Sequence, residues 1–168
     1  MPKGLKQSSS LITISAGMTE SAPNTFTQSQ VDLQLNPLDN EVFVVQAINM
    51  DPSPPDYVGG LNSFVTCSLS TTSRTTVGTL ADSSVFAGAS RDIRTDPTGG
   101  VAFEQTSMET PPSGLEYVGI IATNDFFLQT LGGNNALPKD LRVKVYGYRA
   151  TAEASVYAAL VQSEVLSS

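Results

Sequence analysis

The chain contains no histidine, which removes the imidazole chemistry on which many enzymes depend. Ser-His-Asp and Cys-His nucleophiles, histidine-ligated zinc and imidazole acid-base catalysis all need that side chain. Three carboxylates, Glu104, Glu116 and Asp125, are candidates for the acidic pair of a glycosidase. Sugar binding usually relies on large aromatic platforms, however, and the chain has no Trp, five Tyr and seven Phe. We therefore expect scattered surface carboxylates, no catalytic residue and no enzymatic activity.

Metal and cofactor sites are weakly indicated. Asp51 with Asp56, and Asp92 with Asp96, lie in irregular segments whose oxygen atoms suit a calcium ion. No EF-hand pattern accompanies them, so a loop-bound calcium ion is unsupported and solvated loop charge is the better interpretation. No phosphate-binding glycine motif is present, and we read the three glycine pairs as turns. We predict no cofactor and no metal.

Cys67 is the single cysteine of the chain, which excludes an internal disulfide. It lies in the segment FVTCSLS, where no cationic neighbour is present to activate a thiol. We therefore predict that Cys67 is a small buried core residue.

The clearest strand signal lies in LRVKVYGYRATAEASVYAALV, which runs from Leu141 to Val161. Aliphatic residues occupy one parity of its first half, and Arg142, Lys144, Tyr146 and Tyr148 occupy the other. Because side chains alternate across a strand, this pattern predicts a half-buried strand with one basic and aromatic face. Such a face could stack bases and bind phosphates, but the acidity of the chain opposes that interpretation. A contact with a neighbouring subunit is the commoner meaning.

Four residues are our candidates for contacts between subunits, because exposed aromatic and arginine side chains commonly anchor interfaces. They are Tyr57 in the proline-rich segment, and Tyr146, Tyr148 and Arg149 in the predicted strand.

Several other segments carry strand signals. They are residues 11–14, 26–35, 42–50, 61–70, 75–80, 85–87, 101–106, 117–122 and 141–150. Residues 42–50 form the most continuously apolar run of the chain, which predicts a central strand covered on both faces. The proline- and glycine-rich segment 51–60 and the turn-rich segment 107–116 predict surface loops. With about eight strands and no fixed repeat, the expected fold is all-β, a two-sheet antiparallel sandwich.

Two regions are harder to assign. Residues 71–97 carry the weakest signal, and residues 126–131 are compatible with a strand or one helical turn. The tail from Glu153 to Leu166, which includes Ser155 to Val161, fits a strand, which Val156 and Tyr157 favour, or a helix, which its three alanines favour. We favour the strand and keep the helix as the alternative.

The chain has 168 residues, a net charge of −7 and a mean hydropathy near zero. This size fits one domain, which we place at residues 11–168 after a polar N-terminal arm at residues 1–10. Neither a secretory signal nor a transmembrane segment is expected, so we predict synthesis in the cytoplasm and no membrane insertion. The charge makes direct binding to nucleic acid or to anionic lipid unfavourable.

The polar arm, the short strands, the long loops and the closing segment KVYGYRATAEASVYAALVQSE resemble single jelly-roll coat proteins of microbial viruses. The resemblance implies a Greek-key jelly-roll sandwich and a structural virion protein that assembles into an icosahedral capsid shell. The implied partners are copies of itself and other virion proteins, with loops 51–60 and 107–116 available for contacts.

The arm departs from coat proteins that bind their genome directly, because Lys3 and Lys6 are its only basic residues. We therefore expect the genome to be neutralised elsewhere, beneath an internal viral membrane or another protein layer. Two alternatives stay open: a fibre or filament subunit, and a non-catalytic β-sandwich module that binds a ligand.

Overall fold

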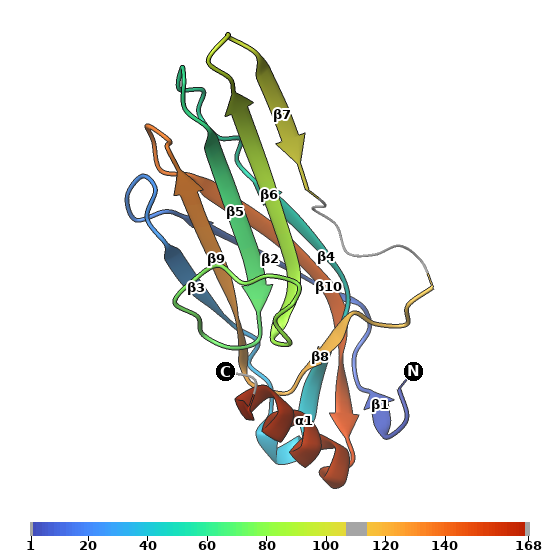
Figure 1. Cartoon of the computed structure of the whole chain (residues 1–168). Helices are drawn as coiled ribbons and strands as arrows, with labels where there is room; N and C mark the ends of the chain where they lie inside the picture. Colours follow the sequence, from blue (N-terminus) through green and yellow to red (C-terminus); the bar gives the residue numbers. More distant parts are fainter. Residues whose placement is uncertain (1, 107–113, 167–168) are drawn as a thin grey trace.

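The structure is a computed structural model, and it describes residues 2–106 and 114–166. Two antiparallel sheets pack face to face, and one helix lies at the lower end of Figure 1. The predicted all-β sandwich is confirmed. Its elements are β1 (Leu5–Gln7), β2 (Ile12–Thr19), β3 (Thr27–Asp32), β4 (Glu41–Pro52), β5 (Ser63–Ser70), β6 (Val85–Thr95), β7 (Val101–Gln105), β8 (Gly119–Ile121), β9 (Asp125–Gly133), β10 (Asp140–Ala152) and α1 (Ala154–Leu166).

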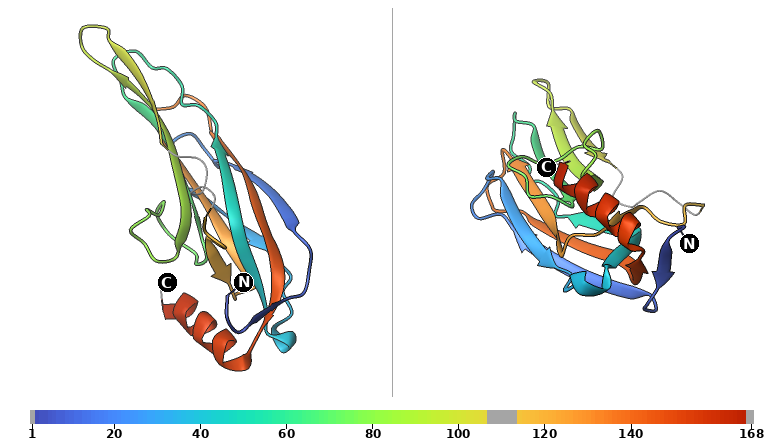
Figure 2. Two further views of the ribbon diagram at one scale, coloured as in Figure 1. Left: turned by 90° about the vertical axis from the view of Figure 1, so that its right-hand side faces the viewer. Right: turned by 90° about the horizontal axis from the view of Figure 1, so that it is seen from below.

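The strands pair in a nested order along the chain. β2 pairs with β10, β3 with β9, β4 with β8 and β5 with β6. β10 also pairs with β4, and β9 with β5, so the paired strands join into two sheets. The first sheet contains β2, β1, β10, β4 and β8, and the second has the order β3-β9-β5-β6-β7. Figure 2 shows the two layers from the side.

The main core fills the space between the sheets. β10 contributes Leu141, Val143 and Val145, all on the parity that its alternation predicted. Cys67 lies in the same core, where burial raises the pKa of its thiol to about 12. The prediction that this cysteine is buried is confirmed, and at neutral pH its thiol is protonated and unreactive.

β4 is covered on both faces along its first half, from Val42 to Val45, but Gln46, Asn49 and Asp51 of its second half are exposed, so the prediction for residues 42–50 is confirmed only in part. The register shifts where Tyr146 and Gly147 of β10 lie opposite Ala47 and Val45, and this bulge leaves Gln46 unpaired. A Cβ atom at Gly147 would lie 2.3 Å from the carbonyl oxygen of Val44, so the bulge needs a residue without a side chain here.

The tail forms a helix, so the strand expected at Ser155 to Val161 is wrong. α1 lies across the outer face of the first sheet, where six apolar side chains of β4, β10 and the segment after β8 would otherwise meet water. Four helix residues at helical spacing cover them: Val156, Tyr157, Leu160 and Val161. The sequence pattern of the tail is compatible with a strand and with a helix. The apolar patch on the outer face of the sheet favours the helix, because the helix covers it.

The segment between β5 and β6, residues 71–84, covers the lower part of the outer face of the second sheet, where Ser68, Ser70 and Gln129 are buried (Figure 1). The strand predicted at Thr75 to Leu80 is wrong. Backbone N–H groups of this segment bind side chains of the sheet, as at Gly78, and do not pair with the backbone of a neighbouring strand. The buried amide of Gln129 donates to Gln28 and Ser70 and accepts from Ser68. The Ser68 hydroxyl in turn accepts from the backbone N–H of Gly78.

Two further segments are more regular than the sequence indicated. β6 runs from Val85 to Thr95, through the charged residues that we had placed in a loop. Within the segment expected as a polar arm, Leu5–Gln7 forms β1 and pairs with the end of β10. Residues 126–131 lie within β9, so the strand alternative for that segment is confirmed.

Candidate functional site

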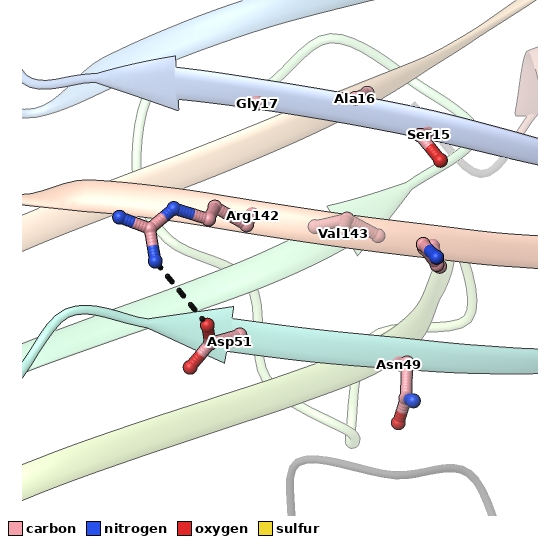
Figure 3. A pocket seen from close by; sticks show the side chains of 8 residues that line it. Ser15, Ala16, Gly17, Asn49, Asp51, Arg142 and Val143 are labelled. Atoms are coloured by element: carbon pink, nitrogen blue, oxygen red, sulfur yellow. Dashed lines mark ion pairs between the residues drawn. The ribbon is translucent and has the colours of Figure 1, made fainter.

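The exposed half of the outer face of the first sheet contains a depression of about 600 Å³ (Figure 3). Three neighbouring strands line it, because their outward residues lie in register. Arg142 of β10 lies between Gly17 of β2 and Asp51 of β4. Two residues farther along β10, Lys144 lies between Ser15 of β2 and Asn49 of β4 in the same way. The small side chains of β2 keep the face low on that side.

The charges in this depression are only partly compensated. Asp51 binds two arginines, with 3.6 Å between its Oδ2 and Nη1 of Arg142 and 3.2 Å between its Oδ1 and Nη2 of Arg91. Within the described residues, Lys144 has no ion-pair partner. The depression therefore offers a positive charge beside a hydroxyl and an amide, a set that suits a carboxylate or another polar group.

Two of the four predicted contact residues are accessible. Tyr57 is 63% exposed in the segment between β4 and β5. Tyr146 is half-buried on the outer face of β10, two residues beyond Lys144. The structure does not bring these two tyrosines together, because they belong to a loop and to the middle of a sheet.

Tyr148 is not exposed, and our expectation of an accessible side chain there is wrong. Only 7% of the residue is accessible, because α1 covers the part of β10 that contains it. Burial raises the pKa of its hydroxyl, and the negative charge of Glu116 raises it further. Tyr148 therefore belongs to the cluster beneath the helix.

Arg149 is held by groups of its own chain. Its guanidinium donates to Oε2 of Glu41 at 3.0 Å and to the carbonyl oxygens of Leu33 and Gln34 at 2.9 and 3.1 Å. These carbonyls follow β3, so Arg149 connects the first sheet to the end of a strand of the second. Its contacts explain a structural role, and they leave only part of its hydrogen-bonding capacity for another subunit.

A buried polar network joins three loops at the opposite end of the sandwich from α1. Glu20 accepts from the N–H groups of Gly132 and Lys139, at 2.6 and 2.9 Å. The ammonium group of Lys139 binds Asp56, and Asn135 donates its side chain to the carbonyl of Phe64. Sequence reasoning missed this network, because its members lie far apart in the chain and form no motif.

The two predicted carboxylate pairs are used within the fold. Asp56 is bound by Lys139, whereas Asp51 is bound by arginines, so these two carboxylates do not meet at one site. Asp96 accepts from the hydroxyl and N–H of Thr98 and from the N–H of Gly100, and these bonds lower its pKa. Among the described residues, no group of three or more Cys, Asp or Glu side chains could hold a metal ion.

The three carboxylates considered for glycoside hydrolysis lie on separate elements. Glu104 of β7 pairs with Arg94, and Asp125 at the start of β9 accepts from the side chain of Gln30. Glu116 lies in the exposed segment before β8. Most of the predicted contact loop 107–116, namely residues 107–113, lies outside the described residues.

Within residues 2–106 and 114–166, no helix is long and apolar enough to cross a membrane. No protein-family model matches the chain, and no curated protein matches it either.

Proposed function

We propose that this protein is a structural subunit of a virion, a jelly-roll coat protein that assembles with copies of itself into an icosahedral capsid shell. The function is non-catalytic, and its active surfaces are contacts between subunits. Other virion proteins are further partners, and the capsid shell is its location.

The observation that carries this proposal is the nested pairing of eight strands. Among β2, β3, β4, β5, β6, β8, β9 and β10, the first pairs with the last, the second with the seventh, the third with the sixth and the fourth with the fifth. A long hairpin wound once around a barrel axis would produce this order, so the pairing supports the two Greek keys that we propose for a jelly roll. β1 and β7 extend the two sheets at their edges.

The fold alone does not assign a function, so the surfaces and the charge are the second support. The loops at the end of the sandwich distant from α1 expose Tyr57, Leu61 and Leu137 to solvent. Exposed apolar side chains on ordered loops are typical of contact surfaces. The hydrogen bonds and the ion pair beneath these loops hold them in place, which favours a repeatable contact between identical subunits.

The charge distribution bears on the position of the genome. The chain has a net charge of −7, and Lys3 and Lys6 are the basic residues of its first ten. We infer that the genome is neutralised by another layer, such as an internal membrane or a second protein. Nucleic-acid density in contact with Lys3 and Lys6 on most subunits of a particle would contradict this inference.

Electron microscopy of the purified protein and of native particles tests the proposal. Closed shells of uniform diameter are expected, whereas open filaments would indicate a fibre subunit, because they reflect a contact that does not close. The binding module would instead be supported by a protein that stays monomeric at high concentration. Its melting temperature would rise when a glycan or another small ligand is added.

A matched pair of variants makes this test specific for loop contacts. The Tyr57→Ala substitution removes an exposed side chain and should impair shell formation while leaving the melting temperature unchanged. The Leu38→Ala substitution removes a side chain that is even more exposed, at 91%, from the end of the sandwich where α1 lies, and serves as its control. Equal assembly by both variants would remove Tyr57 from the contact.

A further inference from the structure

The hairpin of β6 and β7 ends the second sheet with an open edge. In the part of the chain that the structure describes, β7 pairs with β6 and with no other strand. Figure 1 shows this hairpin reaching farther than the neighbouring loops, and the side view in Figure 2 shows its tip standing clear of the first sheet. A strand in this position has one row of backbone N–H and C=O groups available to another strand.

The edge lacks the features that usually protect such a strand from pairing. Every residue of β7 is exposed, including Val101 at 58% and Phe103 at 56%. The strand contains neither lysine nor proline, and Glu104, its one charged residue, is paired with Arg94 of β6. Soluble monomers place charges, prolines or bulges at long edges, because an unprotected apolar edge pairs with other chains.

The backbone pattern identifies the groups that face outward. The N–H of Thr106 donates to the carbonyl of Ser90, and the N–H of Asp96 donates to the carbonyl of Gly100. In an antiparallel ladder, hydrogen-bonded residues alternate with residues whose backbone groups point away. The even-numbered residues of β7 therefore bind β6, and Val101, Phe103 and Gln105 direct their N–H and C=O groups to the open edge.

We propose that β7 is a self-association edge, which pairs antiparallel with β7 of a second copy about a twofold axis at Phe103. This register places Phe103 opposite Phe103 of the second copy, and Val101 opposite Gln105. Both residues of each opposed pair have outward backbone groups, so each pair exchanges two hydrogen bonds. The second sheets of the two copies then form one continuous sheet.

Side chains also favour this register. The two Phe103 rings meet at the axis, where an aromatic cross-strand pair stabilises an antiparallel sheet. Glu104 lies opposite Ala102 of the second copy, so the two glutamates do not face each other. A twofold contact uses the same patch on both copies, and a short strand with its apolar residue at the centre meets that requirement.

Single-cysteine cross-linking tests the register. In a hydrogen-bonded antiparallel pair the Cα atoms are about 5.5 Å apart, within the range of a disulfide. The Phe103→Cys variant should therefore form a disulfide-linked dimer under mild oxidation. In the Gln105→Cys variant the new thiols are separated by four residues along the strands, about 13 Å, and should not react. Cys67 is buried, and the unsubstituted protein measures its background.

Equal cross-linking of the two variants, cross-linking of Gln105→Cys alone, or none in either would overturn the twofold register at Phe103. Melting curves of both variants confirm that each is folded, which is expected because both side chains are exposed.

Analytical ultracentrifugation tests the contact without chemistry. The Phe103→Lys substitution places two ammonium groups face to face at the axis and should weaken dimer formation at least tenfold. Val101→Lys adds the same charge at an equally exposed position of the same face, opposite Gln105, and should weaken it far less. Equal effects, or a monomeric unsubstituted protein at high concentration, would contradict the proposal.

The outcome is separable from the virion function. Closed shells from a Phe103→Lys variant that assembles normally would remove the β7 contact and leave the capsid proposal standing. Dimers that cross-link through Phe103→Cys but never form shells would support the β7 contact and contradict the capsid proposal.

Discussion

The ammonium group of Lys139 lies 2.5 Å from Oδ1 of Asp56, and this ion pair joins the loop after β4 to the segment before β10. The Lys139 side chain is 8% exposed and that of Asp56 is 28% exposed, so solvent screens the attraction between the two charges only weakly. The second carboxylate oxygen accepts from the N–H groups of Ala136 and Leu137. One carboxylate therefore organises the loop end of the sandwich that we propose for subunit contacts.

Removal of this carboxylate should destabilise the fold. We expect Asp56→Ala to lower the free energy of unfolding by about 2 kcal/mol, because it leaves the Lys139 charge buried without its partner. Urea denaturation at neutral pH measures this loss. The control is Arg94→Ala, which breaks an ion pair whose side chains are 61% and 56% exposed and should cost less than about 1 kcal/mol. Equal losses would show that burial of the Asp56 pair has no energetic weight.

The carboxylate of Asp56 should also make the free energy of unfolding depend on pH. The hydrogen bond and charge of Lys139, with the N–H groups of Leu137 and Ala136, hold the pKa of Asp56 below its usual value. A lowered pKa stabilises the fold above the pKa of the unfolded chain, and that contribution is lost as the pH falls through the folded pKa. The stability difference between the unsubstituted protein and Asp56→Asn should be full at neutral pH and shrink below about pH 4. Urea titrations over this range would refute the assignment if the difference stayed constant.

The two tyrosines of β10 should respond differently to truncation. Tyr148 lies beneath α1 in a cluster with Val44 and Ala150, so Tyr148→Ala should lower the free energy of unfolding by about 3 kcal/mol. Tyr146 is half-buried on the outer face of the same strand, and Tyr146→Ala should cost less than about 1 kcal/mol. Thermal melting of both variants provides the comparison. Equal stability of the two would mean that α1 does not cover Tyr148 in solution.

α1 is attached at its far end by a carboxylate. Glu164 accepts from the N–H groups of Ala122 at 2.8 Å and Thr123 at 2.9 Å. The Glu164→Ala substitution leaves these N–H groups without that acceptor, and should cost about 2 kcal/mol. Hydrogen exchange at Ala122 and Thr123 should accelerate before global unfolding. Gln162→Ala changes an exposed residue of the same helix and serves as the control, whose exchange rates should match those of the unsubstituted protein.

Much of the sheet architecture was predictable, because its signals are local. The alternation in β10 identified its core face, and the apolar run of β4 predicted the coverage on both faces that the first half of this strand has. Proline and glycine in residues 51–60 excluded regular structure between two strands. The strand at Thr75 to Leu80 was wrong because the backbone N–H of Gly78 binds the Ser68 hydroxyl instead of a neighbouring strand, and Ser68 is in turn held by Gln129 from a segment distant in sequence.

The candidate surfaces were less predictable than the strands. Tyr57 is as exposed as its proline-rich segment suggested, but Tyr148 has the same position in the strand pattern as Tyr146 and a different environment. The cause is α1, whose position on the sheet depends on a patch assembled from β4, β10 and the segment after β8. The partners of Arg149 follow β3, more than a hundred residues earlier in the chain.

The sequence by itself determined the all-β class, the burial of Cys67 and the two-faced character of β10, because each depends on residue type and spacing along one segment. The open edge of β7, the loop network of Asp56 and Lys139, and the helix in place of a final strand were decided by tertiary structure. Each of these depends on which segments meet across the sandwich, and the free energy of burying a surface belongs to both segments that share it.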